Sequence, residues 1–89
     1  MKTKVEQMGS PKTGLKVANQ FIITSPEGIF FQSYNSIIVK RSKGKTYLDE
    51  YYWNISKTTG KYRNIFLGEK TAETMAKIKS GEYILTNLN

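Results

Sequence analysis

The chain has 89 residues and a mass of 10.2 kDa, which is enough for one hydrophobic core and too little for two. Its 14 Lys and Arg residues against seven Asp and Glu residues give a formal charge of +7, which favours anionic partners, nucleic acid first among them. The absence of Cys and His excludes disulfides and thiol nucleophiles and removes the most common metal ligand and general base. We therefore expect no cofactor, no metal and no enzymatic activity.

Residues 1–16 show no sustained hydrophobic period. They carry four Lys residues, and Val5 and Leu15 are isolated apolar positions. We interpret this segment as a flexible basic arm in front of a single β-rich domain over residues 17–89. The arm either becomes ordered on a nucleic acid or is an irregular terminus, and both interpretations remain open.

Three strands are predicted between residues 17 and 45, where β-branched and aromatic residues alternate with turn residues. Pro26 and Gly28 stand at the second and fourth positions of a tight turn, and Gly44 marks a later reversal. The predicted segments are a strand at 17–24, a turn at 25–28, strands at 29–34 and 37–41, and a turn at 42–45.

Two further strands are predicted between residues 46 and 67. Residues 46–53 are rich in Tyr and lack Gly and Pro, and residues 54–60 form a polar loop. In residues 61–67, Tyr62, Asn64 and Phe66 alternate with Arg63, Ile65 and Leu67, which indicates a strand with two different faces.

The segment after Gly68 has the signals of a short helix. Thr71 can cap its start, Glu73 lies in the first turn, and Gly81 follows the last turn. An apolar stripe at helical spacing contains Ala72, Met75, Ala76 and Ile78. Residues 83–85 either add a last short strand or pack as a tail.

These elements predict an α+β fold, with an antiparallel sheet of about five strands and one short C-terminal helix packed on it through Met75 and Ile78. The residues expected in the core are Phe21, Ile22, Phe30, Ile38, Leu48, Trp53 and Phe66. No apolar run is long enough for a membrane span, and residues 1–14 lack the apolar segment of a signal peptide. We expect no membrane partner and a cytoplasmic location.

Basic and aromatic residues are interleaved along the predicted sheet. Bases stack on aromatic rings while Lys and Arg neutralise phosphates, so this combination favours nucleic-acid binding. The candidate binding residues are Lys40, Arg41, Lys43, Lys45, Tyr47, Tyr51, Lys57, Lys61, Tyr62 and Arg63. For any single aromatic residue, core or cross-strand packing is at least as good an explanation. Twelve of the 14 basic residues are Lys, which suits phosphate contacts better than base reading.

Carboxylates are the remaining candidates for catalysis. Asp49 and Glu50 are adjacent on a predicted strand and therefore point to opposite faces, where they do not easily share a proton or a metal. An active site made of Asp49, Glu69 and a Lys is the enzymatic alternative, which we do not favour.

The C-terminal half of the chain resembles a group of short bacteriophage-encoded proteins without an assigned function. The resemblance rests on Lys61-Tyr62-Arg63-Asn64, on Phe66-Leu67-Gly68-Glu69 and on the segment 78–83. It implies a viral accessory protein in a bacterial cytoplasm, and it implies no mechanism and no site residues.

The sequence therefore predicts a small basic protein that binds nucleic acid, DNA or RNA, with little sequence specificity. The alternative is a protein-binding module that inhibits or redirects a host bacterial protein, for which an acidic partner would match the charge of +7. A homodimer, which would enlarge the modest core, is also compatible with the sequence.

Overall fold

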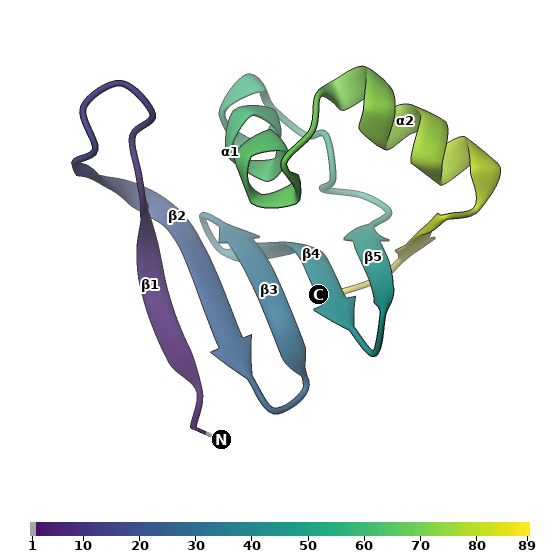
Figure 1. Ribbon diagram of the computed structural model, residues 1–89, viewed down its shortest axis with the longest axis horizontal. Coiled ribbons are helices and arrows are strands. Elements are labelled where there is room, and N and C mark those ends of the chain that lie inside the picture. Colours follow the sequence, from purple (N-terminus) through teal and green to yellow (C-terminus); the bar gives the residue numbers. More distant parts are fainter. Residues whose placement is uncertain (1) are drawn as a thin grey trace.

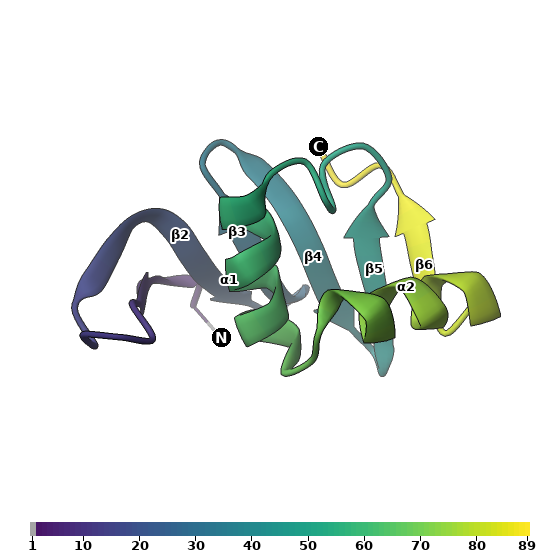
Figure 2. The ribbon, with the colours of Figure 1, turned by 90° about the horizontal axis from the view of Figure 1, so that it is seen from above.

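The computed structural model describes residues 2–89, which form an α+β unit. Its elements are β1 (Lys4–Gly9), β2 (Lys16–Ser25), β3 (Gly28–Ser33), β4 (Ser36–Ser42), β5 (Lys45–Asp49), α1 (Lys57–Leu67), α2 (Thr71–Ser80) and β6 (Tyr83–Thr86). The strands form one mixed sheet in sequence order, antiparallel throughout except for the parallel pair β5 and β6. Along the chain, both helices come after β5 and before β6. They cover the same face of the sheet (Figures 1 and 2). Within residues 2–89, neither helix is long and apolar enough to cross a membrane.

Two tight turns position the central strands of the sheet. The strands predicted between residues 17 and 41 are confirmed as β2, β3 and β4. Lys43 and Gly44 both have positive φ, 53° and 77°, as the two-residue hairpin turn whose twist matches that of the strands requires. Gly28 has φ 143°, and a Cβ there would lie 2.4 Å from the carbonyl oxygen of Arg41. Only glycine therefore allows β3 to start this close to β4.

The hydrophobic core lies between the sheet and the helices. Phe31, Val39 and Leu48 are neighbours in register on β3, β4 and β5, and all three are fully buried. Phe66 of α1 stacks on Phe31 with the ring centroids 5.8 Å apart. Full burial of one such side chain contributes about 1.5–3 kcal/mol, so this row fixes α1 on the sheet.

The expected core is confirmed in part. Ile38 and Leu48 are buried in it, and Ile22, Trp53 and Phe66 are partly buried and pack against it, whereas Phe21 and Phe30 are not part of this cluster. Because successive side chains of a strand point to opposite faces, Phe30 faces away from the helices when Phe31 faces them.

Residues 4–9, expected in a flexible arm, form the edge strand β1. This strand pairs antiparallel with β2 through Val5 and Ile23 and through Gln7 and Phe21, and Met8 is only 6% exposed. Such pairing consists of backbone hydrogen bonds and needs little apolar patterning in the edge strand itself. The interpretation of residues 1–16 as an arm outside the domain is thus corrected for residues 4–9, while Met1 lies outside the described residues.

The strand predicted over residues 46–53 ends at Asp49. The buried carboxylate of Asp49 accepts hydrogen bonds from the backbone N–H groups of Tyr51 and Tyr52, 3.1 and 2.8 Å away. These bonds turn the chain out of the sheet, as Asp side chains commonly do in turns. On its other oxygen Asp49 accepts from the N–H of Leu88 at 2.8 Å and from the Asn89 amide at 3.0 Å, which fixes the C-terminal residues.

The predicted loop at 54–60 and strand at 61–67 are wrong, because residues 57–67 form α1. Ser56 caps the helix by accepting a hydrogen bond from the N–H of Thr59, and Gly68 ends it in the left-handed conformation with φ 72°. The alternation of Tyr62, Asn64 and Phe66 fits a strand, but positions 59, 62, 63, 66 and 67 also share one helical face, and that face contacts the sheet.

The helix predicted from Thr71 is confirmed as α2, with Gly81 just beyond its end. Its N-cap is Lys70 instead of Thr71, and its apolar stripe does not pack as expected. Met75 is 56% exposed, whereas Thr74 is fully buried and Ile78 packs against the core. This orientation of α2, with Thr74 buried and Met75 exposed, follows from Glu69. The Glu69 carboxylate accepts hydrogen bonds from Thr74, Lys77 and the Tyr83 hydroxyl.

Replacing Asp49 tests the turn after β5. Burial by itself raises the pKa of Asp49, but hydrogen bonds from Leu88, Tyr52, Asn89 and Tyr51 outweigh it and hold the pKa below its usual range. A carboxyl whose pKa is lowered by folding stabilises the protein above its unfolded pKa of about 3.9, and this contribution is lost as the pH falls through the folded pKa.

We therefore expect Asp49→Asn to lower the free energy of unfolding at pH 7 by about 1–3 kcal/mol and to weaken the loss of stability below about pH 4. Urea unfolding followed by Trp53 fluorescence over a pH series measures both. Glu69, whose pKa is also lowered, leaves the variant some acid sensitivity, and Glu50→Gln at an exposed position is the matched control. Equal acid sensitivity of Asp49→Asn and the wild type would contradict the stabilising role of the Asp49 carboxylate.

Candidate functional site

The β4–β5 hairpin gathers five of the ten candidate binding residues: Lys40, Arg41, Lys43, Lys45 and Tyr47. Lys40 and Tyr47 are opposite each other in the register. Lys43 and Lys45 are exposed, and the turn borders an open pocket of about 380 Å³ lined by residues 41–46. The hairpin thus forms a basic end of the sheet.

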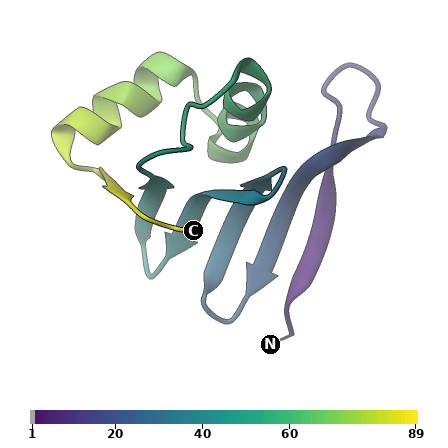
Figure 3. The same ribbon diagram turned by 180° about the vertical axis from the view of Figure 1, so that it is seen from behind.

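Lys40 lies between two aromatic rings on the sheet face that is not covered by a helix of residues 2–89. Its Nζ is 5.8 Å from the centroid of the Phe30 ring and 6.0 Å from that of Tyr47. The three residues are direct neighbours in register on β3, β4 and β5. Since Phe31, Val39 and Leu48 face the helices, Phe30, Lys40 and Tyr47 beside them in the chain face the opposite side. Figure 3 shows the ribbon from behind, and among the described residues no helix crosses in front of the strands. Cations within about 6 Å of a ring centroid are attracted to the ring.

The row continues across the whole sheet. In register with Phe30 lies Ile23 and then Val5, and in register with Tyr47 lies Ile84. Val5 is 59% and Ile84 37% exposed. We call the row of Val5, Ile23, Phe30, Lys40, Tyr47 and Ile84 the open-face row. It is apolar and aromatic with one ammonium group near its middle, and Lys45, two residues before Tyr47, faces the same side.

Arg41 faces the other way. Its guanidinium carbon lies 5.7 Å from the ring centroid of Phe66, a residue of α1. Arg41 is exposed, so it extends the basic end of the hairpin towards the helix side without joining the open-face row.

Three further candidates lie apart from the hairpin. Tyr51 is 70% exposed in the turn after β5 and packs edge-to-face on Tyr52, with the centroids 4.7 Å apart. Lys57 and Lys61 are exposed on α1, on the helix side of the sheet (Figure 2). The exposed candidate binding residues are therefore divided between two sides of the molecule.

Tyr62 and Arg63 are buried and cannot touch a polymer in this structure. Tyr62 is 5% exposed and Arg63 fully buried. Nη1 of Arg63 donates to the Trp53 carbonyl oxygen at 2.6 Å and to Asn54 Oδ1 at 3.1 Å. Nη2 donates to Asn64 Oδ1 and to Thr71 Oγ1, both at 2.9 Å. Arg63 thus ties the turn after β5, α1 and the start of α2 together.

The buried guanidinium of Arg63 is surrounded almost entirely by neutral groups. Burial lowers the pKa of the guanidinium, and the charge of Glu69 partly offsets this effect. Among residues 2–89, Nε of Arg63 has no hydrogen-bond partner. The guanidinium lies 5.1 Å from the Trp53 ring centroid, which adds a cation–π attraction.

The prediction of Phe30 as a core residue is wrong, because Phe30 and Phe31 are adjacent on one strand and cannot both face the helices. That adjacency was the available signal. Two other apolar members of the row, Val5 and Ile84, lie on the edge strands β1 and β6, for which the sequence carries only weak signals.

The carboxylates weighed for catalysis hold structural positions. Asp49 binds the turn after β5 and the C-terminal residues, and Glu69 is bonded by Lys77 at 2.7 Å and by the Tyr83 hydroxyl at 2.7 Å. Within residues 2–89, no group of three His, Cys, Asp or Glu side chains is placed to hold a metal ion.

Replacing Arg63 tests its structural role. We expect Arg63→Lys and Arg63→Gln each to lower the free energy of unfolding by about 2–4 kcal/mol, because four partly buried hydrogen bonds from a charged donor are lost or weakened. Urea unfolding measures the change, and Arg41→Lys at an exposed position is the matched control. Wild-type stability of Arg63→Lys would show that charge alone suffices and would contradict the fork of four hydrogen bonds.

Comparison with known proteins gives one match. Residues 3–83 match the model of a Family of unknown function (DUF8033). A search of curated proteins and a search of solved structures each return no match. Because the matched residues span nearly the whole chain, the protein belongs to this family of unknown function.

Proposed function

We propose that the protein binds single-stranded nucleic acid, with little sequence specificity, through the open-face row and the basic end of the β4–β5 hairpin. The observation that carries the proposal is the placement of Lys40 between the Phe30 and Tyr47 rings on the uncovered sheet face. A base can stack on an aromatic ring while the adjacent ammonium group contacts the phosphate.

The geometry of the row supports a single strand over a duplex. Six strands at about 4.8 Å spacing give a track of about 24 Å, with rings on which unpaired bases can stack. In a duplex the ring faces of the bases are already stacked on each other. Stacking is worth about 1–3 kcal/mol per base and tolerates every base, and Lys is a point charge without the fork by which Arg reads guanine. Low sequence specificity follows.

The charges of the hairpin give the first prediction for this function. Fluorescence anisotropy of a single-stranded oligonucleotide with a 5′-hydroxyl and a 3′ label should show binding that weakens with salt, with a logarithmic slope of about −2 if about three phosphates are neutralised. Lys43→Gln with Lys45→Gln should reduce the magnitude of the slope by about 1.4.

The control for that experiment is Lys57→Gln with Lys61→Gln, which removes the same charge from the helix side. It should leave the slope nearly unchanged. If both double variants weaken binding equally, the interaction follows net charge and has no place on the hairpin, and the proposal fails.

A protein-binding module is the second candidate, because α2 borders an apolar pocket of about 310 Å³ lined by Trp53, Met75, Ala76, Ile78 and Lys79. This pocket lies on the helix side, and exposed apolar patches commonly mark protein interfaces. The partner proposed here is an acidic protein of a bacterial host.

Tyr47 and Met75 separate the two candidates. For nucleic-acid binding, Tyr47→Leu should weaken oligonucleotide affinity about tenfold, while Tyr47→Phe, which keeps the ring, and Met75→Glu should change it little. For protein binding, the oligonucleotide should not bind even at low salt, and Met75→Glu should abolish capture of an acidic protein from a nuclease-treated bacterial lysate.

A further inference from the structure

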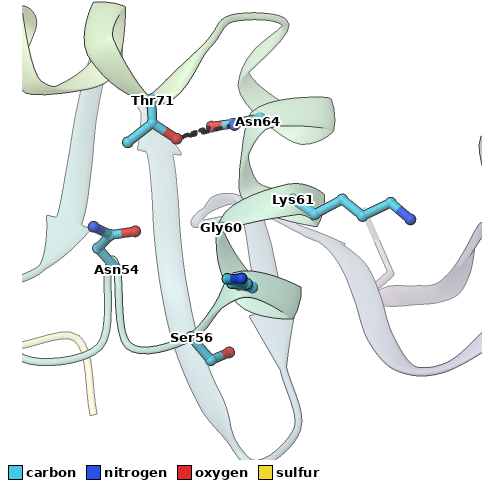
Figure 4. A pocket seen from close by; sticks show the side chains of 7 residues that line it. Asn54, Ser56, Gly60, Lys61, Asn64 and Thr71 are labelled. Carbon is cyan, nitrogen blue, oxygen red and sulfur yellow. Dashed lines mark hydrogen bonds between the residues drawn. The ribbon is translucent and has the colours of Figure 1, made fainter.

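A second polar site lies on the helix side of the molecule. A pocket of about 520 Å³ opens between α1, the loop before it and the start of α2 (Figure 4). Its lining residues are Asn54, Ser56, Lys57, Gly60, Lys61, Asn64 and Thr71. Four of them come from α1 at positions spaced by three or four residues, so they share one helical face.

Only positive charge lines or underlies this pocket. Lys57 and Lys61 are its charged lining residues, and the fully buried Arg63 lies beneath it. The ion pairs among residues 2–89 are Lys4 with Glu6 and Lys77 with Glu69, so Arg63 has no carboxylate at ion-pair distance. Glu69 acts on Arg63 only at longer range, and its oxygens are bonded by Lys77, Thr74 and Tyr83.

The floor of the pocket is organised by Arg63. Its side-chain acceptors Asn54, Asn64 and Thr71 all line the pocket, and Figure 4 shows them around the space above α1. Because Arg63 occupies the amide oxygen of Asn54, the amide nitrogen of Asn54 is left to donate elsewhere, and it has no acceptor among residues 2–89. Arg63 is thus a positioning residue, which sets the donors without being exposed itself.

Gly60 keeps the pocket open. It lies inside α1, where glycine costs roughly 0.5–1 kcal/mol relative to alanine. A Cβ at this position would lie 3.5 Å from Asn54 Oδ1 and 3.7–3.8 Å from the terminal nitrogens of Arg63. These are ordinary contact distances, so the fold would accept alanine. What glycine provides here is free space directly above the guanidinium.

We infer that this pocket binds a phosphate group, either free phosphate or the phosphomonoester of a nucleotide or of a nucleic-acid 5′ end. A buried cation without a counter-ion is costly, and a bound anion offsets that cost. The ammonium groups of Lys57 and Lys61 and the Asn54 amide supply donors, of which the charged ones form the stronger bonds to phosphate. The site lies across the sheet from the open-face row and does not depend on the function proposed for that row.

The test is an amide NMR titration of the full chain with inorganic phosphate at constant ionic strength. We expect saturable shifts confined to residues 54–64 and 71. Gly60→Ala, which fills the space, and Lys57→Gln with Lys61→Gln should each weaken binding about tenfold or more, whereas Lys43→Gln with Lys45→Gln should not change it. Gly60→Ala should be at least as heat-stable as the wild type, so unfolding cannot imitate the loss.

Two further arms identify the source of the phosphate. A nucleoside monophosphate against its nucleoside tests a small ligand, and a 5′-phosphorylated against a 5′-hydroxyl oligonucleotide tests a strand end. A 5′-hydroxyl oligonucleotide that shifts only the open-face row reports the proposed function separately. Shifts that do not saturate, equal affinity of Gly60→Ala and the wild type, or no shift with any phosphorylated ligand would overturn the inference.

Discussion

The guanidinium of Arg63 is the contact on which the arrangement of the helices depends. It joins the Trp53 backbone and Asn54 after β5, Asn64 on α1 and Thr71 at the start of α2. These three segments all belong to the long connection that joins the parallel strands β5 and β6. Parallel strands always need such a crossover. Because Arg63 holds the crossover together, both helices stay on one face of the sheet.

The other face of the sheet therefore has no partner within residues 2–89 apart from the C-terminal residues near Asp49 and Ile37. The two-residue period of the strands decides which residues lie on this face. Phe30 and Tyr47 lie on it because they precede the core residues Phe31 and Leu48, which face the helices. Lys40 keeps this aromatic surface charged, as edge and surface strands commonly require to avoid aggregation. The same charge makes the surface suitable for an anionic polymer.

The elements predicted correctly are those whose local sequence pattern is compatible with only one structure. They are the hairpins around Pro26 and Gly44, and α2, which ends before Gly81. The prediction failed at α1 because Tyr62, Asn64 and Phe66 satisfy the periods of both a strand and a helix, and the caps Ser56 and Gly68 carry the deciding information. It failed at Arg63 because a basic residue is normally exposed, and its burial depends on acceptors up to ten residues away in the chain. The edge strand β1 depends on pairing with β2, which local sequence does not encode. For the proposed binding site, the hairpin residues could be named from the sequence, but their separation from Lys57 and Lys61 could be seen only in the fold.

Photo-crosslinking tests whether nucleic acid binds to the open-face row, as we propose. A single-stranded oligonucleotide that carries 5-iodouracil and a 5′-hydroxyl, irradiated with the protein and analysed by peptide mass spectrometry, reports which aromatic residues touch a base. We expect crosslinks at Tyr47 and Phe30. Crosslinks confined to Tyr51, Trp53 or the helices would overturn the proposal.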